Sequence, residues 1–447
     1  MNNANSNTAR RLRAISVQKL FGVFDHRIEL NEERITIIHG PNGYGKTAVL
    51  RLVAGLFERH YSMLRNVPFE SVSFELNDGT TIHVKQTPAR QNGKPTKPGL
   101  QILCGEHEWE WRQQRPDARL ELPRHFMDER IPWLHRIDED TWFDNQTGEQ
   151  LDTGELCDRY SEYLPIQHRP DKTPDWLQHI QDSVQVYFIR ANRLESPTMP
   201  EMPRTMRRHP FASASAVATY ANELAERIQR VQSEYAKLSQ SLDRSFPLRI
   251  MSPTTGSKLS LENVKQRLAA LDQQRKDLNN AGLLEQLSEE GFEQLPEPGE
   301  SQLGVLTVYI DDVEQKLGVF RQLRERIELF RELLNRRFLY KQVRIDKNQG
   351  LVFQTESGQE LPPTALSTGE QHEVVILYRL LFLTKPDSLV LIDEPEISLH
   401  VAWQKPFLKD LVRIAELSKV DFLIATHSPQ IISNRWDLTV ELKGPQR

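Results

Sequence analysis

The chain has 447 residues, enough to bury a sizeable core and to form two or three domains. Its formal net charge of −5 excludes a globally basic protein, so any contact with nucleic acid must come from a local patch. Its two cysteines form no CxxC pair, which argues against a disulfide framework and a cysteine zinc site. No apolar run suggests a membrane span and the polar opening does not resemble a secretory signal, so we expect a cytoplasmic protein without a membrane partner.

The N-terminal part of the chain is expected to be rich in strands. Residues 1–8 are predicted to be a disordered tail, and residues 9–90 the first part of an α/β head. Ile35–Ile38 is a short β-branched run that predicts a buried strand. Residues 71–86 predict a hairpin that turns at Gly79, because Asp-Gly between alternating apolar residues is a strong turn signal.

The next segment, residues 91–209, has little clear periodicity and contains five of the seven tryptophans. We expect it to form an inserted irregular module that returns to the head near residues 185–195. The tryptophans could belong to a core or to a docking surface, and scattered tryptophans more often belong to a core.

The middle of the chain, residues 210–345, is expected to be a helical or short coiled-coil insertion. Apolar residues at alternating steps of four and three predict a long helix: Val217, Ala221, Leu224, Ile228, Val231, Tyr235, Leu238 and Leu242. The helix is expected to break at Phe246-Pro247 and over residues 252–256, to restart at Leu261, and to be followed by a third helical stretch over residues 305–340. A bundle packed on the core and an antiparallel coiled-coil arm fit this pattern equally well.

A phosphate-binding loop is predicted directly after the first buried strand. The run Gly40, Pro41, Asn42, Gly43, Tyr44, Gly45, Lys46 and Thr47 matches the pattern GxxxxGK[ST]. Its glycines allow backbone N–H groups to wrap phosphates, and the following helix presents its positive N-terminal end. We therefore expect Lys46 to reach the β- and γ-phosphates of ATP and the Thr47 hydroxyl to bind Mg²⁺.

Residues 346–447 are expected to complete the head, and a buried strand there ends in two acids. Asp393 and Glu394 follow the apolar run Leu389–Ile392, at the carboxyl edge where open α/β sheets bind ligands. We expect Asp393 to hold Mg²⁺ and Glu394 to act as the general base that polarises the attacking water. Alone, such a pair could be a solvated edge, but the earlier phosphate loop favours the catalytic interpretation.

Two further segments have the residues of anion-binding sites. One consists of Ser367, Thr368, Gly369 and Glu370, which open an apolar helix. A helix N-terminus with serine and glycine can bind an anion, although Ser367 alone would be an ordinary N-cap. The other is His427, which follows an apolar strand beginning at Asp421. A lone histidine after a strand is more often structural than catalytic.

In their order along the chain, the four motifs resemble those of ABC-type ATPases. The resemblance identifies Ser367–Glu370 as the signature that clamps the γ-phosphate held by another subunit, and His427 as the switch histidine that contacts it. It also implies an ABC-type P-loop NTPase head, with a mixed sheet, helices and N-terminal antiparallel strands. The active site would then be completed only when two copies close on each other.

The long spacing between the first two motifs resembles the Rad50/SMC/RecF-like branch of these ATPases. Within it, the segments STGEQHEVVILYRLLF, LVLIDEPEISLHVAWQ and ATHSPQII are most similar to bacterial AAA_15/AAA_21, OLD-like ATPases. His400 stands where the D-loop usually has Asp, which is normal for this group. Asn192 stands where relatives carry the Q-loop glutamine, and its shorter reach leaves the rate of hydrolysis open.

The resemblance also implies a biological role. The chain continues for only 20 residues after His427, so we expect no TOPRIM nuclease domain and no chemistry besides ATP hydrolysis. ATPases of this type resemble the ATPase subunits of Septu-like or PARIS-like antiphage systems, in which an oligomeric scaffold controls a separate effector protein, a nuclease or toxin encoded nearby.

Two alternatives stay open. One is a Rad50/RecF-like repair ATPase that clamps duplex DNA, for which arginines within residues 204–208 and 321–337 are candidates. Because acids are interspersed among the second group, a solvated helix face explains it better. The other is a slow scaffold in which ATP is mainly a structural switch, and a Glu394→Gln turnover assay would distinguish it from an ATPase.

Overall fold

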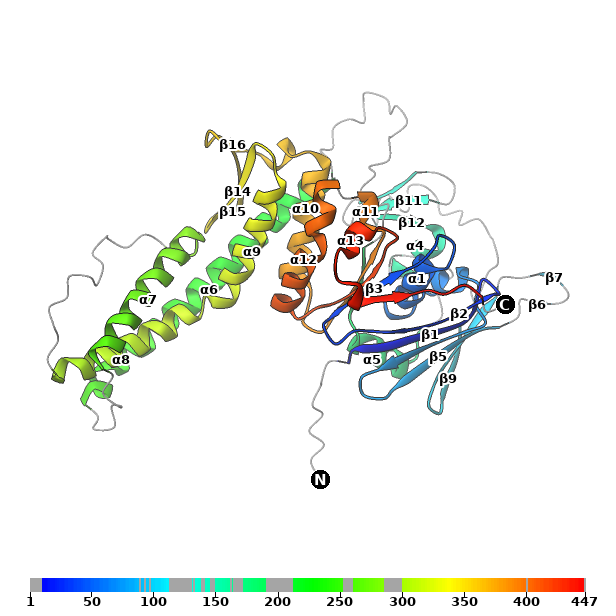
Figure 1. Ribbon diagram of the computed structural model, residues 1–447, viewed down its shortest axis with the longest axis horizontal. Helices are drawn as coiled ribbons and strands as arrows, with labels where there is room; N and C mark the ends of the chain where they lie inside the picture. The colour runs from blue at the N-terminus through cyan, green and yellow to red at the C-terminus, as the bar shows by residue number, and fades with distance from the viewer. Residues whose placement is uncertain are drawn as a thin grey trace. The chain divides into compact units, whose positions relative to one another are not determined.

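A computed structural model describes most of the chain, in two compact units (Figure 1). The head unit comprises the chain up to Arg207 and from Leu383 onward, and the helical unit comprises Arg208–Phe382. The expected N-terminal tail lies outside the described residues. The described residues are 10–87, 90–91, 94–95, 98–111, 131, 133–137, 141–144, 149–160, 163, 172–189, 212–251, 260–284, 300–398 and 401–445.

A five-stranded parallel sheet forms the centre of the head unit. Its strands, in spatial order, are β13 (Val186–Ile189), β17 (Leu389–Asp393), β18 (Asp421–Ala425), β3 (Ile35–His39) and β19 (Thr439–Glu441). Every residue of β17 and β18 is buried, as continuous apolar runs in parallel strands predict. Helix α1 (Lys46–Phe57) contacts three of these strands. The buried strand expected from Ile35 is confirmed.

A separate antiparallel sheet of six strands contains the expected hairpin, which turns at Gly79 with φ 85°. Its order is β2 (Phe24–Glu29), β1 (Leu12–Leu20), β4 (Ser71–Leu76), β5 (Thr81–Thr87), β8 (Gly99–Cys104) and β9 (His107–Trp111). The last two strands lie where an irregular module is expected. They form because Leu100 and Ile102 of β8 point into the core. An alternation over so few residues does not stand out in the sequence.

The remaining strands and helices of the head unit surround these sheets. They are β6 (Arg90–Gln91), β7 (Lys94–Pro95), β10 (Leu134–Arg136), β11 (Thr141–Asp144), β12 (Glu149–Asp152), α2 (Tyr61–Asn66), α4 (Thr153–Arg159), α5 (Asp175–Ser183), α11 (Pro395–Ser398), α12 (Val401–Ser418) and α13 (Pro429–Ile432). The tryptophans of residues 91–184 belong to cores. Trp111 and Trp142 are buried, and Trp109, Trp133 and Trp176 pack against buried clusters.

The helical unit contains four long helices: α6 (Ala212–Met251), α7 (Leu261–Asn280), α8 (Glu300–Gly318) and α9 (Arg321–Arg337). Of these, α8 packs against both α6 and α7. The break expected at Phe246-Pro247 is wrong, since α6 continues to Met251, and residues 252–256, where the second break is expected, lie outside the described residues. Proline lies there in the final turns, where the ion pair between Arg249 and Asp312 of α8 holds the helix end. The expected single stretch over residues 305–340 is two helices, separated at Phe320, which is buried against Tyr235.

The helical unit extends to Phe382, beyond residue 345, where the sequence pattern places its end. It includes β14 (Lys341–Asp346), β15 (Gly350–Thr355), β16 (Glu360–Leu361) and α10 (Thr368–Tyr378). Packing against the long helices explains this: β15 contacts α6, β14 contacts α9, and Tyr378 of α10 stacks on Tyr220 of α6 with ring centroids 4.6 Å apart.

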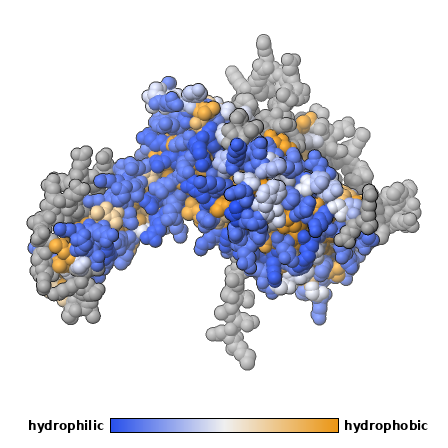
Figure 2. All heavy atoms as spheres, viewed as in Figure 1, coloured by the Kyte–Doolittle hydropathy of each residue, from blue (hydrophilic) through white to orange (hydrophobic). Residues whose placement is uncertain are grey.

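The face of the molecule seen in Figure 2 is mostly hydrophilic. Within the described ranges, no helix combines the length and the apolar character that crossing a membrane requires.

Candidate functional site

Three motifs that are distant in sequence meet at the carboxyl edge of the parallel sheet. The register places Asp393 of β17 opposite Ala425 of β18, and Ala425 opposite Ile38 of β3. The phosphate loop follows β3, Glu394 follows β17, and His427 lies just beyond the end of β18. Parallel pairing therefore places the ends of all three strands, and the residues that follow them, along one edge.

The phosphate loop has the backbone geometry that its glycines predict. Gly45 has φ 92°, and a Cβ there would lie 2.3 Å from Leu20 Cδ2, so a larger residue would be strained and crowded. Lys46 Nζ donates hydrogen bonds to the carbonyl oxygens of Gly40 at 2.9 Å and Pro41 at 3.2 Å. The ammonium group therefore lies inside the loop, where bound phosphates are expected.

The Thr47 hydroxyl donates a hydrogen bond to Asp393 Oδ1 at 2.9 Å, although the two residues are 346 positions apart. Burial raises the pKa of Asp393 to about 6, and the negative charge of the neighbouring Glu394 adds to the rise, while the Thr47 hydrogen bond opposes it. A hydroxyl and a carboxylate are hard oxygen donors, which is the ligand chemistry that Mg²⁺ prefers. The pair thus fits a magnesium ion.

Glu394 occupies an unusual backbone conformation at this edge. Its φ is 42°, in the left-handed region that residues other than glycine rarely adopt, and its N–H donates to the Ala425 carbonyl at 2.8 Å. Such strain is retained where the surrounding structure enforces it, and it occurs often at active sites. Glu394 Oε1 lies 3.8 Å from His427 Nδ1, so the general-base candidate and the switch-histidine candidate are neighbours.

Glu396 is a site residue that the sequence analysis missed. Its Oε1 accepts hydrogen bonds from Thr426 Oγ1 at 2.7 Å and from the His427 N–H at 3.0 Å, and it lies 3.2 Å from His427 Nδ1. The available signal was a third acid in the run Asp-Glu-Pro-Glu. Its position depends on α11, which begins at Pro395 and turns the chain.

The signature candidate lies in the helical unit, at the N-terminus of α10. Ser367 Oγ accepts from the Glu370 N–H at 3.3 Å, and Glu370 Oε2 accepts from the Ser367 N–H at 2.7 Å. This reciprocal pair is a capping box, so Ser367 is an N-cap as expected. Lys341 Nζ also donates to Glu370 Oε2, at 2.8 Å, a contact that the sequence analysis did not foresee.

Two expected site residues, Asn192 and His400, lie outside the described residues, as do Arg204, Arg207 and Arg208. The Q-loop and D-loop assignments therefore remain predictions.

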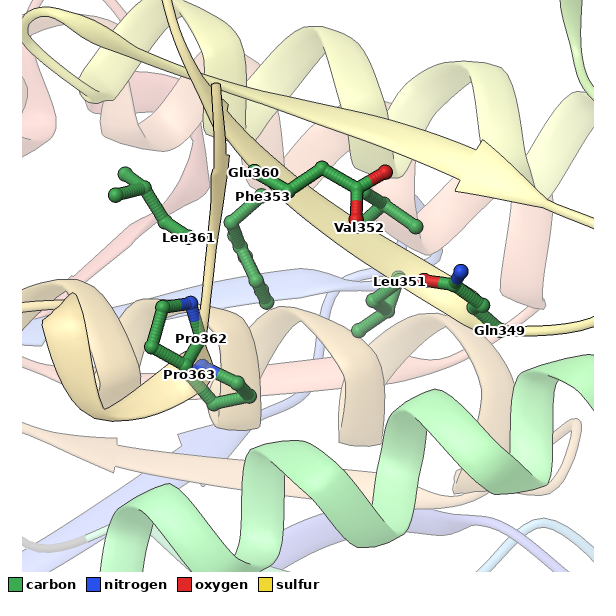
Figure 3. A pocket seen from close by; sticks show the side chains of 8 residues that line it. All are labelled: Gln349, Leu351, Val352, Phe353, Glu360, Leu361, Pro362 and Pro363. Atoms are coloured by element: carbon green, nitrogen blue, oxygen red, sulfur yellow. The ribbon is translucent and has the colours of Figure 1, made fainter. Parts of the chain in front are cut away.

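The helical unit also contains a pocket, whose last lining residue, Pro363, lies four residues before Ser367 (Figure 3). It is lined by Gln349, Leu351, Val352, Phe353, Glu360, Leu361, Pro362 and Pro363. The lining residues come from β15 and β16, from Gln349 just before β15 and from the two prolines after β16, and none of them belongs to the four motifs.

Comparison with protein families identifies one domain. The family model AAA_21, described as "AAA domain, putative AbiEii toxin, Type IV TA system", matches residues 207–433. A search of curated proteins found no match.

Two solved structures are similar over most of the chain. One is the Smc head domain of Pyrococcus furiosus with an extended coiled coil, bound to the C-terminal domain of ScpA. It is 12% identical with a TM-score of 0.35, over 95% of this chain and 92% of that one. The other is the SMC head domain from Thermotoga maritima, 13% identical with a TM-score of 0.31, over 94% and 91%. At these TM-scores the two likenesses do not bear on the assignment of the site.

Proposed function

Because the chain belongs to the AAA_21 family of AAA domains, we propose that it binds ATP with Mg²⁺ and hydrolyses it at the carboxyl edge of its parallel sheet. The proposal is supported above all by the 2.9 Å contact between the Thr47 hydroxyl and Asp393 Oδ1, which joins the phosphate loop to the acidic strand end. In P-loop NTPases these two groups hold the magnesium ion.

Each residue of the edge has a role in this proposal. The backbone N–H groups of the loop and Lys46 hold the phosphates, and Thr47 and Asp393 hold Mg²⁺. The bound metal ion neutralises charge on the phosphate oxygens. Glu394 accepts a proton from the attacking water, and His427 contacts the γ-phosphate.

A second copy of the chain completes the site in this proposal. Ser367, Thr368 and Gly369 open α10, whose N-terminal N–H groups and helix dipole favour an anion. By the resemblance to ABC-type ATPases, this signature meets the γ-phosphate held by the other copy. The partner is therefore the chain itself, as a homodimer or a larger oligomer.

The proposed biological role is the sensor or scaffold subunit of a two-component antiphage system, with a separate nuclease or toxin as effector. The family description names a putative toxin of a type IV toxin–antitoxin system, which places a toxic activity, though not its control, in the same family. The duplex-DNA clamp gains less support, since three arginines of its candidate patch make contacts within the helical unit. Arg324 pairs with Asp277, Arg331 donates to a backbone carbonyl, and Arg337 pairs with Glu373.

Phosphate release by Glu394→Gln, compared with wild type at saturating ATP and Mg²⁺, tests the hydrolysis. We expect turnover to fall by about 10²- to 10⁴-fold, because the amide cannot accept the proton, while ATP still binds. Glu416→Gln, on the exposed face of α12, is the control and should keep wild-type turnover. Equal rates in Glu394→Gln and wild type would contradict the proposal and favour the slow scaffold.

A further inference from the structure

Glu396 makes an unusual set of contacts for a residue outside the four motifs. Three nitrogen or oxygen atoms from two consecutive residues, Thr426 and His427, lie within 3.2 Å of its single oxygen Oε1. Its side chain is only 8% exposed, and its other oxygen is buried without a hydrogen-bond partner among the described residues. A buried carboxylate needs such donors, and hydrogen bonds to a charged acceptor are the stronger kind.

Stabilisation of the backbone after β18 accounts for only two of these three contacts. The Thr426 hydroxyl and the His427 N–H would be enough to fix the backbone there. The additional contact, between Oε1 and His427 Nδ1, acts on the imidazole ring itself. The ring is 47% exposed, so without this contact it could rotate among several rotamers.

The two carboxylates near His427 differ in distance. Glu396 Oε1 lies 3.2 Å from Nδ1, within hydrogen-bond range, whereas Glu394 Oε1 lies at 3.8 Å, beyond it. A ring held by Glu396 presents its other nitrogen, Nε2, away from that carboxylate, and it does not occupy the carboxylate of Glu394. The two distances therefore indicate different roles for the two carboxylates: Glu396 contacts the His427 ring, and Glu394 does not.

We propose that Glu396 is a positioning residue: it accepts the Nδ1–H of His427, fixes the orientation of the ring, and leaves Glu394 free to act on water. This inference rests on the proposed ATP hydrolysis. It assigns a function to the third acid of the Asp-Glu-Pro-Glu run, which neither the family match nor the four motifs assign.

A double-mutant cycle on the full-length protein tests the inference. We expect Glu396→Gln to lower kcat by about 10- to 100-fold, because the carboxylate that orients the imidazole ring is lost. KM should change little. In a His427→Ala background the same substitution should change kcat by less than about twofold, because a residue that acts through another has no separate effect once that other is gone.

The matched control is Glu155→Gln. Glu155 is a similarly buried glutamate that accepts a backbone N–H, from Asp152, in the capping box of α4. Its loss can lower thermal stability, but it should leave kcat unchanged. Because Glu396→Gln could also disturb folding, Glu396→Asp is the second variant. It keeps the charge but withdraws the carboxylate from Nδ1, so it should lower kcat in the same way.

Losses that add in the cycle would overturn the inference, since Glu396 would then act independently of His427. If the wild-type protein releases no phosphate, the proposed hydrolysis fails instead, so the two failures are distinguishable. NMR of protein labelled with ¹⁵N-histidine gives a readout without turnover. The His427 Nδ1 signal should shift in Glu396→Gln and stay unchanged in Glu155→Gln, and an unshifted signal in Glu396→Gln would overturn the contact.

Discussion

Asp158 of α4 is a carboxylate outside the site whose environment links stability to pH. Burial raises its pKa to about 7, against the hydrogen bonds that its Oδ2 accepts from the Ser62 N–H at 2.8 Å and from the Ser62 hydroxyl. An aspartate in an unfolded chain has a pKa of about 3.9. Between these values the folded protein binds more protons than the unfolded chain, so stability falls as pH rises through this window.

We therefore predict that Asp158→Asn removes part of this pH dependence. Wild-type protein should lose up to about 2 to 4 kcal/mol of unfolding free energy through this group between pH 4 and pH 8, whereas Asp158→Asn, which cannot ionise, should not. Urea denaturation at several pH values measures the difference. Asp175→Asn, at an exposed position on α5, should retain the wild-type slope. An unchanged slope in Asp158→Asn would contradict the prediction.

At the scale of elements, β14 contacts the N-terminus of α10, which contains the proposed signature. Lys341, the first residue of β14, donates to Glu370 Oε2 at 2.8 Å and to the Ala365 carbonyl at 3.2 Å. The same Glu370 oxygen accepts the Ser367 N–H, so the lysine charge supports the capping box that shapes the start of α10. Because α9 leads directly into β14, the contact also connects the long helices to the signature.

We predict that Lys341→Met lowers ATP turnover by roughly fivefold, since a helix cap is worth about 1 kcal/mol. Affinity for nucleotide should not change, because in the proposed dimer the signature acts on ATP held by the other copy. Phosphate release and the binding of a fluorescent ATP analogue measure the two quantities. Lys409→Met, exposed on α12, should resemble wild type in both. A loss of affinity with unchanged turnover would contradict this arrangement.

At the scale of the whole molecule, the two halves of the proposed site lie on different units, the phosphate loop on the head unit and Ser367 on the helical unit. We predict that Glu394→Gln with ATP and Mg²⁺ forms a dimer or larger oligomer, because ATP held without hydrolysis keeps both halves engaged. Lys46→Ala, which lacks the ammonium group proposed to bind phosphate, should keep the oligomeric state that it has without nucleotide.

Native mass spectrometry, with and without ATP and Mg²⁺, measures this assembly. The same measurement on protein expressed with its genomic neighbour tests the proposed effector, which should co-purify with the oligomer. A protein that stays monomeric with ATP and assembles only when duplex DNA is added would contradict the proposed role and favour the DNA clamp.

The placement of the motifs at the sheet edge was predictable from the sequence because each motif is local. A run of glycines before Lys46 specifies a loop that can wrap phosphates, and a buried strand before Asp393 places two acids at a sheet edge. Burial of β3, β17 and β18 follows from their continuous apolar runs in the same way. Neighbouring residues within a few positions decide these features, so no distant contact is needed to infer them.

Only the tertiary structure decided which distant groups meet. The contact of Thr47 with Asp393 depends on the parallel register of β3, β18 and β17, and the contact of Glu396 with His427 depends on the turn into α11. Likewise, α10 belongs to the helical unit because Tyr378 stacks on Tyr220 of α6. Packing between segments far apart in the chain sets each of these contacts, and local propensity contains no information about such packing.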